Sequence, residues 1–459
     1  MKSHHRLKFV WLLATLPQTI ALAAQTTTST QNIDAAHPEL PPQAIVLRIL
    51  QNHPDIRIKD ALLRAEEAEG RRLQAGPHEW NLGLTRQQRR IQTPDPVTGA
   101  TRYNEWDASL QRGIRLPGKA QTDEALAHAG IEALHWSRGE TLHETSRKLL
   151  TDWFSGLREE ASARAWAEQA ALLDKQAQQL NRRRELGDAS RLEALQATAA
   201  AAQARSQARM SRSRANAAAI ELQQRYPGLT LPDVLPETTP QALTDPPELW
   251  LDGILKQDHE LGTARAETRR AQLLARRVDQ ERLPDPTLGL MMGRERSGEE
   301  RVTGLTLSIP LPGEARSTQR DAELARADAA ARREAAVLQK VRAEALSQIE
   351  QARGAFEAWQ ASEDAARELW DAAGLAARAW QLGEGTLAES LAARRLAFEA
   401  RLTAQHNRLD ALEIHNRLLL DSHRLWPLDD HADETHDEKG TAEQDQPDTA
   451  TTFNTFSPS

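Results

Sequence analysis

One pattern occurs twice in this chain, as LGDASRLEAL at residues 186–195 and as LGEGTLAESL at residues 382–391. In each copy a glycine ends one helix, and a hydroxyl side chain followed three positions later by glutamate starts the next. The residues in these roles are Gly187, Ser190 and Glu193 in the first copy and Gly383, Thr386 and Glu389 in the second. A single capping box arises by chance in many helical proteins. Two capping boxes with the same spacing from a preceding glycine predict two tight turns between antiparallel helices.

The rest of the chain is duplicated as well. Residues 82–84 (LGL) recur 206 positions later, at residues 288–290. Residues 116–118 (LPG) recur 195 positions later, at residues 311–313, and the two turns lie 196 positions apart. The spacing changes only in connections, where insertions are tolerated. We therefore interpret the chain as two copies of one structural unit, with a longer hairpin in the first copy.

The composition favours long helices over one large globular core. Only 4% of the 459 residues are aromatic, and Ala, Arg, Gln and Glu are abundant. The 58 basic and 66 acidic residues give a net charge of −8, so charge gives no argument for a nucleic-acid partner. The chain has no cysteine, which excludes disulfides, thiolate metal sites and a lipoprotein cysteine. Because motifs for phosphate binding or hydrolysis are absent, we expect neither an enzyme nor a cofactor.

Residues 1–24 have the composition of an export signal. Three basic residues precede an apolar run over residues 9–23, which ends in the small residues that a signal peptidase requires. The run is too short, and too interrupted by Pro17, to cross a bilayer as a helix. Because no later segment is apolar over the required length, we expect the mature protein to have no transmembrane helix.

Each copy is expected to contain a helix, a β-hairpin, a long helix and a returning helix. The expected helices cover residues 42–75, 119–185 and 190–225 in the first copy and 246–282, 314–381 and 387–424 in the second. The expected parts of the chain are 1–24 (signal peptide), 25–41 (extended N-terminal segment), 42–228 (first repeat, hairpin 79–116), 229–245 (linker), 246–427 (second repeat, hairpin 286–311) and 428–459 (acidic disordered tail). Each long helix would reach about 100 Å, so it must pack lengthwise on other helices. Its seam includes Ile349, Ala352, Phe356 and Trp359.

The hairpin segments alternate apolar and polar residues with the period of a β-strand. The apolar positions are Trp80, Leu82, Leu84, Trp106, Ala108, Leu110 and Ile114 in the first hairpin and Leu288, Leu290, Met292, Leu305, Leu307, Ile309 and Leu311 in the second. Four strands cannot close a barrel, and hydrocarbon does not tolerate unpaired strand edges. If lipid covers the apolar faces, three chains give twelve strands with polar residues facing water. The alternative is a soluble periplasmic coiled-coil scaffold in which helices cover those faces.

An export signal precedes two copies of helix, hairpin, long helix, glycine-containing turn and returning helix, so that residues 40–427 resemble the TolC-type outer-membrane efflux protein family. The Leu-Gly-x-x-Ser/Thr-x-x-Glu-x-Leu turns and the Leu-Pro-Gly before each long helix most resemble its heavy-metal branch, the outer component of cobalt-zinc-cadmium efflux systems. The resemblance implies a mainly α fold with a small β part and an internal duplication. It implies a long α-helical periplasmic tunnel of antiparallel, coiled-coil-like helix pairs and a twelve-stranded transmembrane β-barrel shared by a homotrimer.

The implied function is passive conduction of substrate, with heavy-metal cations as the expected substrate. The substrate would pass from a periplasmic adaptor (membrane fusion) protein and an inner-membrane resistance-nodulation-division pump through the channel to the exterior. The implied location is the outer membrane of a Gram-negative bacterium, in contact with its lipid, with a large periplasmic part. An alternative is the same type of channel for drugs or secreted proteins.

The resemblance also assigns roles to the two turns. The adaptor is expected to dock at Gly187, Asp188, Ser190, Glu193, Gly383, Glu384, Gly385 and Thr386. Many relatives line the closed aperture with two acids; Glu389 matches the first, whereas Ala392 stands in place of the second. Where relatives latch the aperture with an aromatic residue and an arginine, this chain has Trp380 and Gly385, so the latch does not carry over. Glu389 is therefore either an aperture carboxylate or only a helix cap.

Two pairs of histidines are weak candidates for metal binding. His431 and His436 lie among acidic residues of the C-terminal tail, a composition that binds cations weakly and usually remains solvated. His53 and His259 occupy equivalent positions in the two copies but lack the His-x-x-x-His spacing of a metal site. A residue shared by both copies of a repeat is more often structural, so we expect no resident metal ion at either pair.

Overall fold

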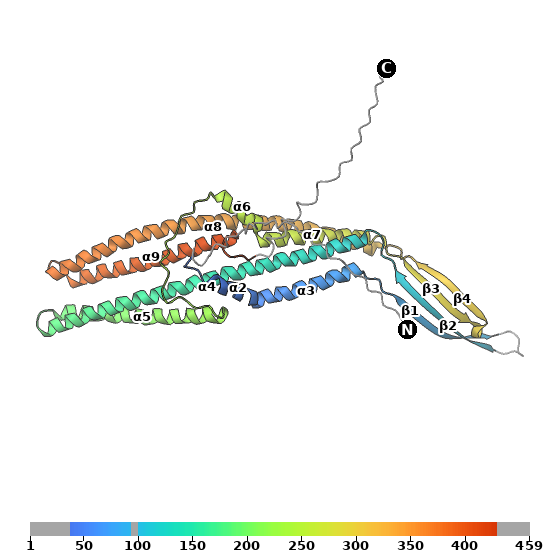
Figure 1. The fold of residues 1–459 in the computed structure, drawn as a ribbon, viewed down its shortest axis with the longest axis horizontal. Coiled ribbons are helices and arrows are strands. Elements are labelled where there is room, and N and C mark those ends of the chain that lie inside the picture. Colours follow the sequence, from blue (N-terminus) through green and yellow to red (C-terminus); the bar gives the residue numbers. More distant parts are fainter. Residues whose placement is uncertain (1–36, 93–99, 429–459) are drawn as a thin grey trace, which may run out of the picture.

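The structure, a computed structural model, describes residues 37–92 and 100–428, which form an elongated rod (Figure 1). A β-sheet occupies one end of the rod, and two turns between long helices occupy the other. The predicted signal peptide, residues 25–36 of the N-terminal segment, and residues 429–459 of the tail with His431 and His436 lie outside the described residues. The two ends of the rod are thus formed by the predicted hairpins and by the two predicted turns.

The order of elements is the same in both halves of the chain. The first half contains α2 (Gln43–Asn52), α3 (Pro54–Ala75), β1 (Asn81–Gln92), β2 (Ala100–Gly113), α4 (Lys119–Glu185) and α5 (Arg191–Arg225). The second half contains α6 (Pro247–Gln257), α7 (His259–Gln280), β3 (Thr287–Glu295), the 3-10 helix η1 (Arg296–Gly298), β4 (Glu300–Ser308), α8 (Glu314–Leu382) and α9 (Leu387–Asp421). The expected fold class, mainly helical with a small antiparallel β part, is confirmed. None of the helices in the described ranges is both long and apolar enough to cross a membrane.

The single helices expected at 42–75 and 246–282 were wrong, because each is broken into two. In the first half the break falls at His53 (φ −64°, ψ 134°), since Pro54 disfavours helical backbone in the residue before it. In the second half the break falls at Asp258, whose carboxylate accepts a hydrogen bond from the Leu261 N–H at 2.7 Å. Asp258 therefore caps α7. A proline in one copy and a capping aspartate in the other end the helix at nearly equivalent points.

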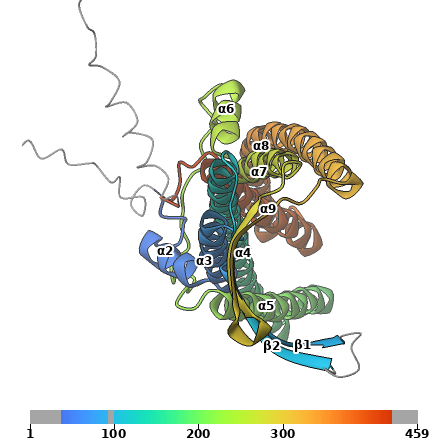
Figure 2. The same cartoon turned by 90° about the vertical axis from the view of Figure 1, so that its right-hand side faces the viewer.

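The two hairpins join into one antiparallel sheet in the order β1-β2-β3-β4. The join is between β2 and β3, where Leu110 lies opposite Leu290 and Trp106 opposite Arg294. The outer edges of β1 and β4 have no strand partner within the described chain. The sheet thus ends in two open edges, one from each copy, and Figure 2, viewed from this end of the rod, shows the strands projecting beyond the helices.

The main apolar core lies midway along the rod, where α4 passes α2 and α9. Trp153, Phe154 and Leu157 of α4 are almost fully buried there. The indole nitrogen of Trp153 donates a hydrogen bond to the backbone oxygen of Glu39 at 2.8 Å, which ties the N-terminal segment to this core. The predicted seam of α8 is partly buried in a second cluster, in which Ile349 packs with α6. Packing is therefore spread along the rod instead of gathered in one globule.

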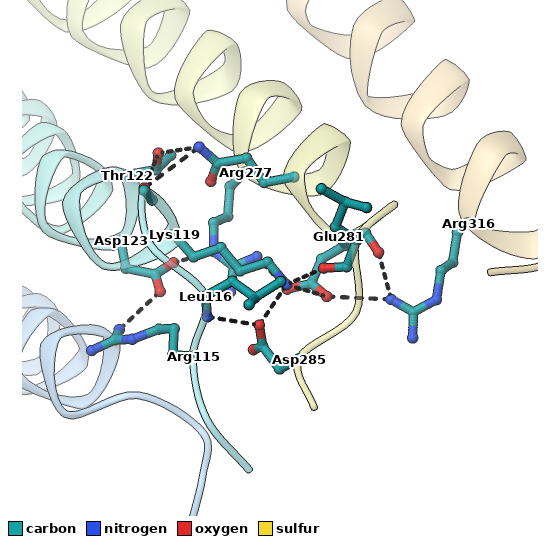
Figure 3. A network of polar contacts seen from close by, with 12 residues as sticks. Arg115, Leu116, Lys119, Thr122, Asp123, Arg277, Glu281, Asp285 and Arg316 are labelled. Atoms are coloured by element: carbon teal, nitrogen blue, oxygen red, sulfur yellow. Dashed lines mark hydrogen bonds and ion pairs between the residues drawn. The ribbon is translucent and has the colours of Figure 1, made fainter. Parts of the chain in front are cut away.

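A network of charged side chains fixes the strands to the helices (Figure 3). The Lys119 ammonium, only 2% exposed, donates to a carboxylate oxygen of Asp285 and to the Leu283 carbonyl, each at 2.8 Å. His78 Nε2 lies 2.7 Å from the other Asp285 oxygen, and the Leu116 N–H donates to Asp285 at 3.0 Å. Burial raises the pKa of Asp285, but these hydrogen bonds outweigh burial and lower that pKa. The buried carboxyl group therefore stays ionised.

The same network reaches the ends of four helices. Asp123 of α4 accepts hydrogen bonds from Arg115 at 3.0 Å and from Arg277 of α7 at 2.5 Å. Arg115 also donates to the carbonyls of the last turn of α3. Arg316 of α8 donates to the backbone oxygen of Glu281 at 2.7 Å. Each hairpin is therefore held at its root by residues from both copies.

We predict that Lys119→Met lowers the midpoint of thermal unfolding by several degrees. The substitution leaves the Asp285 carboxylate buried without its ammonium, and removal of one partner of a buried pair costs about 3–5 kcal/mol. The matched control is Lys340→Met, which removes an ammonium that lies 2.8 Å from Glu260 but is 52% exposed. Its expected cost is below about 1 kcal/mol. Thermal melts followed by circular dichroism compare the two, and equal shifts would contradict the structural role given to Lys119.

Candidate functional site

One face of the sheet is apolar and open to solvent in the single chain. The strand register places Leu82, Leu110, Leu290 and Leu305 in one row across all four strands. Their side chains are 69%, 42%, 43% and 80% exposed, respectively. No described helix covers this face, which we call the apolar face. The alternative in which helices shield the apolar residues of the hairpins is therefore wrong.

The opposite face, which we call the polar face, is crowded and rich in glycine. Gly83 lies opposite Ser109, and Gly289 lies opposite Gln111. A Cβ atom at Gly83 would lie 2.6 Å from Ser109 Oγ, and one at Gly289 would lie 2.7 Å from Gln111 Cγ. Glycine in a strand interior marks a bend or a close approach. Glycine at these positions therefore lets the opposed side chains lie close to the backbone on the polar face.

Charge on the polar face is mainly acidic in the described strands. Its carboxylates are Glu105, Asp107, Glu295 and Glu300, and its one arginine is Arg89. The Arg89 guanidinium lies 3.2 Å from Glu105 and 3.4 Å from Glu295. Arg296 of η1 lies 3.1 Å from Glu300. Two arginines against four carboxylates leave this face with an excess of negative charge.

The two turns at the far end of the rod have the same backbone geometry. Gly187 and Gly383 both adopt left-handed backbone, with φ of 82° and 79°. The N–H of each glycine and the N–H of the following residue donate to carbonyls of the last helical turn, which is the Schellman pattern. The predicted capping boxes are confirmed, at Ser190 with Glu193 and at Thr386 with Glu389. Both turns are therefore determined by local sequence.

The two capping glutamates differ in what their second oxygen contacts. In Glu389 one oxygen accepts hydrogen bonds from the Thr386 N–H and hydroxyl, each at 2.8 Å. In Glu193 one oxygen accepts the equivalent bonds from Ser190, and the other lies 3.3 Å from Nε1 of Trp380, which donates to it. Hydrogen bonds from the capping backbone and hydroxyl lower the pKa of both glutamates. Glu389 therefore remains ionised and, within the described chain, keeps one oxygen for another partner.

The two turns also pack against each other. Leu387, at the start of α9, is buried in a cluster with Leu173, Leu180 and alanines of α4 and α5. Trp380 packs on the same cluster while its indole nitrogen donates to Glu193. The aromatic residue at the expected latch position thus joins the two turns of one chain. Capping and an aperture role do not exclude one another, because only one oxygen of Glu389 is used by the cap.

The predicted docking residues lie together at this end of the rod, and all of them except Glu193 and Gly385, which are half-buried, are exposed. The Asp188 side chain is 70% exposed and accepts a hydrogen bond from Arg183 at 2.8 Å. Leu186 and Leu382, which precede the two glycines, are 79% and 69% exposed. Exposed leucines at matched positions fit a contact surface, but docking at these turns stays a prediction. The charges around the two turns differ, so the two surfaces are related and unequal.

His53 and His259, which occupy equivalent positions in the two copies, have different surroundings. His53 borders a cavity of about 610 Å³ beside α4, together with Glu140, Lys148 and Tyr226. His259 is buried, with its ring 5.7 Å from the ring of Trp136. Within the described ranges, no group of three or more His, Asp or Glu side chains is placed to hold a metal ion. The predicted structural role of these histidines fits this arrangement.

Sequence reasoning missed one titratable group beside that cavity. Burial raises the pKa of Glu140 to about 7, and the nearby carboxylates of Asp258, Glu144 and Glu260 add to this rise against the opposing effect of Arg147. No local pattern marks Glu140, because its acidic neighbours come largely from α7, more than a hundred residues away. Only the pairing of the two copies brings these charges together.

The comparisons with known proteins agree with this geometry. Residues 250–420 match the family model "Outer membrane efflux protein". No curated protein sequence matches the chain. Among solved structures, the Campylobacter jejuni CmeC outer membrane channel is similar with a TM-score of 0.67 and 12% identity, over 90% of this chain and 94% of CmeC. The family match lies in the second copy, and the similarity to CmeC extends over both.

Two further structures show the same fold. The outer membrane protein VceC of Vibrio cholerae has a TM-score of 0.63 and 17% identity, over 83% of this chain and 95% of VceC. CusC, whose structures concern folding and transmembrane channel formation, has a TM-score of 0.60 and 15% identity, over 82% of this chain and 91% of CusC. Residues 250–420 thus match the outer membrane efflux protein family, and nearly the whole chain shares the fold of these outer membrane channels.

Proposed function

We propose that three copies of this chain form the outer-membrane channel of a tripartite efflux system and that the channel conducts heavy-metal cations. The observation that carries the channel is the open-edged sheet with an exposed apolar face. Leu82, Leu110, Leu290 and Leu305 form a continuous apolar row. Exposing such side chains to water costs about 25 cal/mol for each Å² of apolar surface. Lipid removes that cost.

Contact with lipid requires that the sheet be closed. An unpaired N–H or C=O group in hydrocarbon costs several kcal/mol, so the edges of β1 and β4 must find partners. Pairing β4 of one copy with β1 of the next joins the edges without adding another protein. Three copies give twelve strands, with the polar face around a water-filled lumen. The helical part of each copy then continues the same lumen on the periplasmic side.

The charge of the polar face supports a cationic substrate. With this face turned to the lumen, Asp107, Glu295 and Glu300 recur three times around the pore, whereas Glu105 is only 2% exposed. Clefts lined by one sign of charge raise the local concentration of oppositely charged ions. The resemblance of both turns to the heavy-metal branch of the family points the same way. Neutral or anionic drugs and acidic proteins would gain no such attraction from a lumen whose lining is mainly acidic.

The turns at the other end are the proposed contact with a periplasmic adaptor and, through it, with an inner-membrane pump. Leu186 and Leu382 offer two exposed apolar contacts per copy, six in a trimer. The docking residues Gly187, Asp188, Ser190, Glu193, Gly383, Glu384, Gly385 and Thr386 surround them. The channel itself would be passive, since nothing in its described part resembles a nucleotide-binding site. Energy would come from the pump.

We predict that Glu389→Gln lowers the cation selectivity of the channel in planar bilayers by at least about twofold, because it removes three carboxylates around the aperture. The matched control is Glu193→Gln, since the Trp380 indole holds the second oxygen of Glu193. Glutamine preserves a capping box, so both variants keep their turns. Reversal potentials in a salt gradient provide the measurement. Unchanged selectivity in Glu389→Gln, or an equal change in both variants, would remove Glu389 from the pore.

The substrate is tested by growth of a strain that lacks this gene. We expect reduced tolerance to divalent heavy metals such as zinc, cobalt or cadmium, and unchanged tolerance to hydrophobic drugs. Expression of the wild-type chain should restore metal tolerance. If the strain were sensitive to drugs alone, the substrate would be drugs instead of metals, and the proposal of an efflux channel would stand. Normal tolerance to metals, with loss of a secreted protein from the medium, would favour protein secretion instead.

A further inference from the structure

Five arginines extend the apolar face toward the hairpin turns. Arg86, Arg90, Arg102, Arg294 and Arg301 are exposed and point to the same side of the sheet as the leucine row, and we call them the basic surface. The register places Arg86 opposite Trp106, Trp106 opposite Arg294, and Arg294 opposite Arg301. A single row thus crosses all four strands and contains three arginines and one tryptophan.

The basic surface contains unfavourable pairs of like charge. Arg294 lies directly opposite Arg301, and Arg90 lies directly opposite Arg102. Like charges at opposed positions of an antiparallel pair destabilise a sheet. On this face the four described strands carry no aspartate or glutamate, and no ion pair joins these five arginines to a carboxylate elsewhere in the described chain. Their charge is therefore not balanced within the described part of the chain.

Other arginines of the sheet region are balanced or packed. Arg89, on the polar face, lies between Glu105 and Glu295. Arg112, at the helix end of the apolar face, stacks on the Trp80 ring with its guanidinium 5.3 Å from the ring centroid. Within the described strands, the exposed arginines that have neither a carboxylate partner nor an aromatic ring to stack on are thus those of the basic surface. An anion from outside the chain would neutralise this surface.

The place of the basic surface identifies the source of that anion. The leucine row lies toward the helices, and the basic surface lies toward the hairpin turns, so it is on the side of the membrane away from the helical part. Trp106 shares its row, and aromatic residues of membrane barrels gather at the edges of the apolar band. The arginines therefore meet the headgroups of the outer leaflet. Those headgroups belong to a phosphorylated glycolipid, lipopolysaccharide.

We propose that the basic surface binds the phosphate groups of outer-leaflet lipopolysaccharide. Guanidinium groups form paired hydrogen bonds with phosphate, and one phosphate between Arg294 and Arg301 would neutralise both. In a trimer the surface recurs three times on the outside of the barrel. This inference rests on the proposed function, because it requires the apolar face to be in an outer membrane.

The test compares binding of lipopolysaccharide by the purified trimer and by two charge-matched variants. Arg294→Gln with Arg301→Gln removes one opposed pair of the basic surface. Arg57→Gln with Arg64→Gln removes two exposed arginines of α3 and serves as the control. Native mass spectrometry measures retained lipid after mixing with lipopolysaccharide or with its enzymatically dephosphorylated form. We expect the first variant to bind the phosphorylated form at least about tenfold more weakly, and the control to bind as the wild type does.

Three outcomes would overturn the proposal. They are equal binding of phosphorylated and dephosphorylated lipid by the wild type, undiminished binding by the first variant, and an equal loss in the control. Bilayer conductance of each variant is recorded in parallel. Intact conductance with failed lipid discrimination rejects this inference alone, whereas a wild-type protein that neither forms trimers nor conducts rejects the proposed function.

Discussion

Unpaired backbone groups at the two edges of the sheet are the constraint on which the rest of the molecule depends. β1 and β4 each leave one edge without a partner in the described chain, while the apolar face between them is exposed. In water the exposed leucines are costly, and in lipid the open edges are costly. Only pairing with further copies inside a membrane removes both costs at once. The polar contacts at the hairpin roots, centred on Lys119 and Asp285, hold the sheet at the end of the rod where such pairing can occur.

The duplication makes the two halves alike in backbone and different in chemistry. Both turns have the same Schellman geometry and the same capping box. Yet the second oxygen of Glu193 is occupied by Trp380, whereas that of Glu389 has no partner in the described chain. One turn therefore has a structural role in joining the two halves, and the other keeps a carboxylate oxygen for the proposed role at the aperture. The faces of the sheet divide charge in a similar way, with acids on the polar face and arginines beside the apolar face.

The parts of the fold that local sequence determines could be predicted. Gly187 with Ser190 and Glu193 act through neighbours within a few residues. Alternation predicted the apolar positions within the strands, but four further predicted positions lie just beyond the strand ends: Trp80, Ile114, Ile309 and Leu311. The break at His53 follows from Pro54 by the same local rule, although one continuous helix was expected there. The Lys119–Asp285 pair could not be predicted, because it joins residues from different copies and has no counterpart in the other half. The row of Arg86, Arg294 and Arg301 likewise depends on the register between β2 and β3, which no local pattern fixes.

Amide hydrogen exchange of the membrane-embedded protein tests the central claim, closure of the sheet by neighbouring copies, most directly. In lipid nanodiscs, peptides from β1 and β4 are compared with residues 106–111 of β2 and 287–294 of β3, which are paired on both sides within one chain. If the edges pair between copies, we predict that β1 and β4 exchange as slowly as the inner strands. Exchange of alternate amides in β1 and β4 at the rate of exposed loops, with β2 and β3 still protected, would show that the edges remain open and would contradict the account.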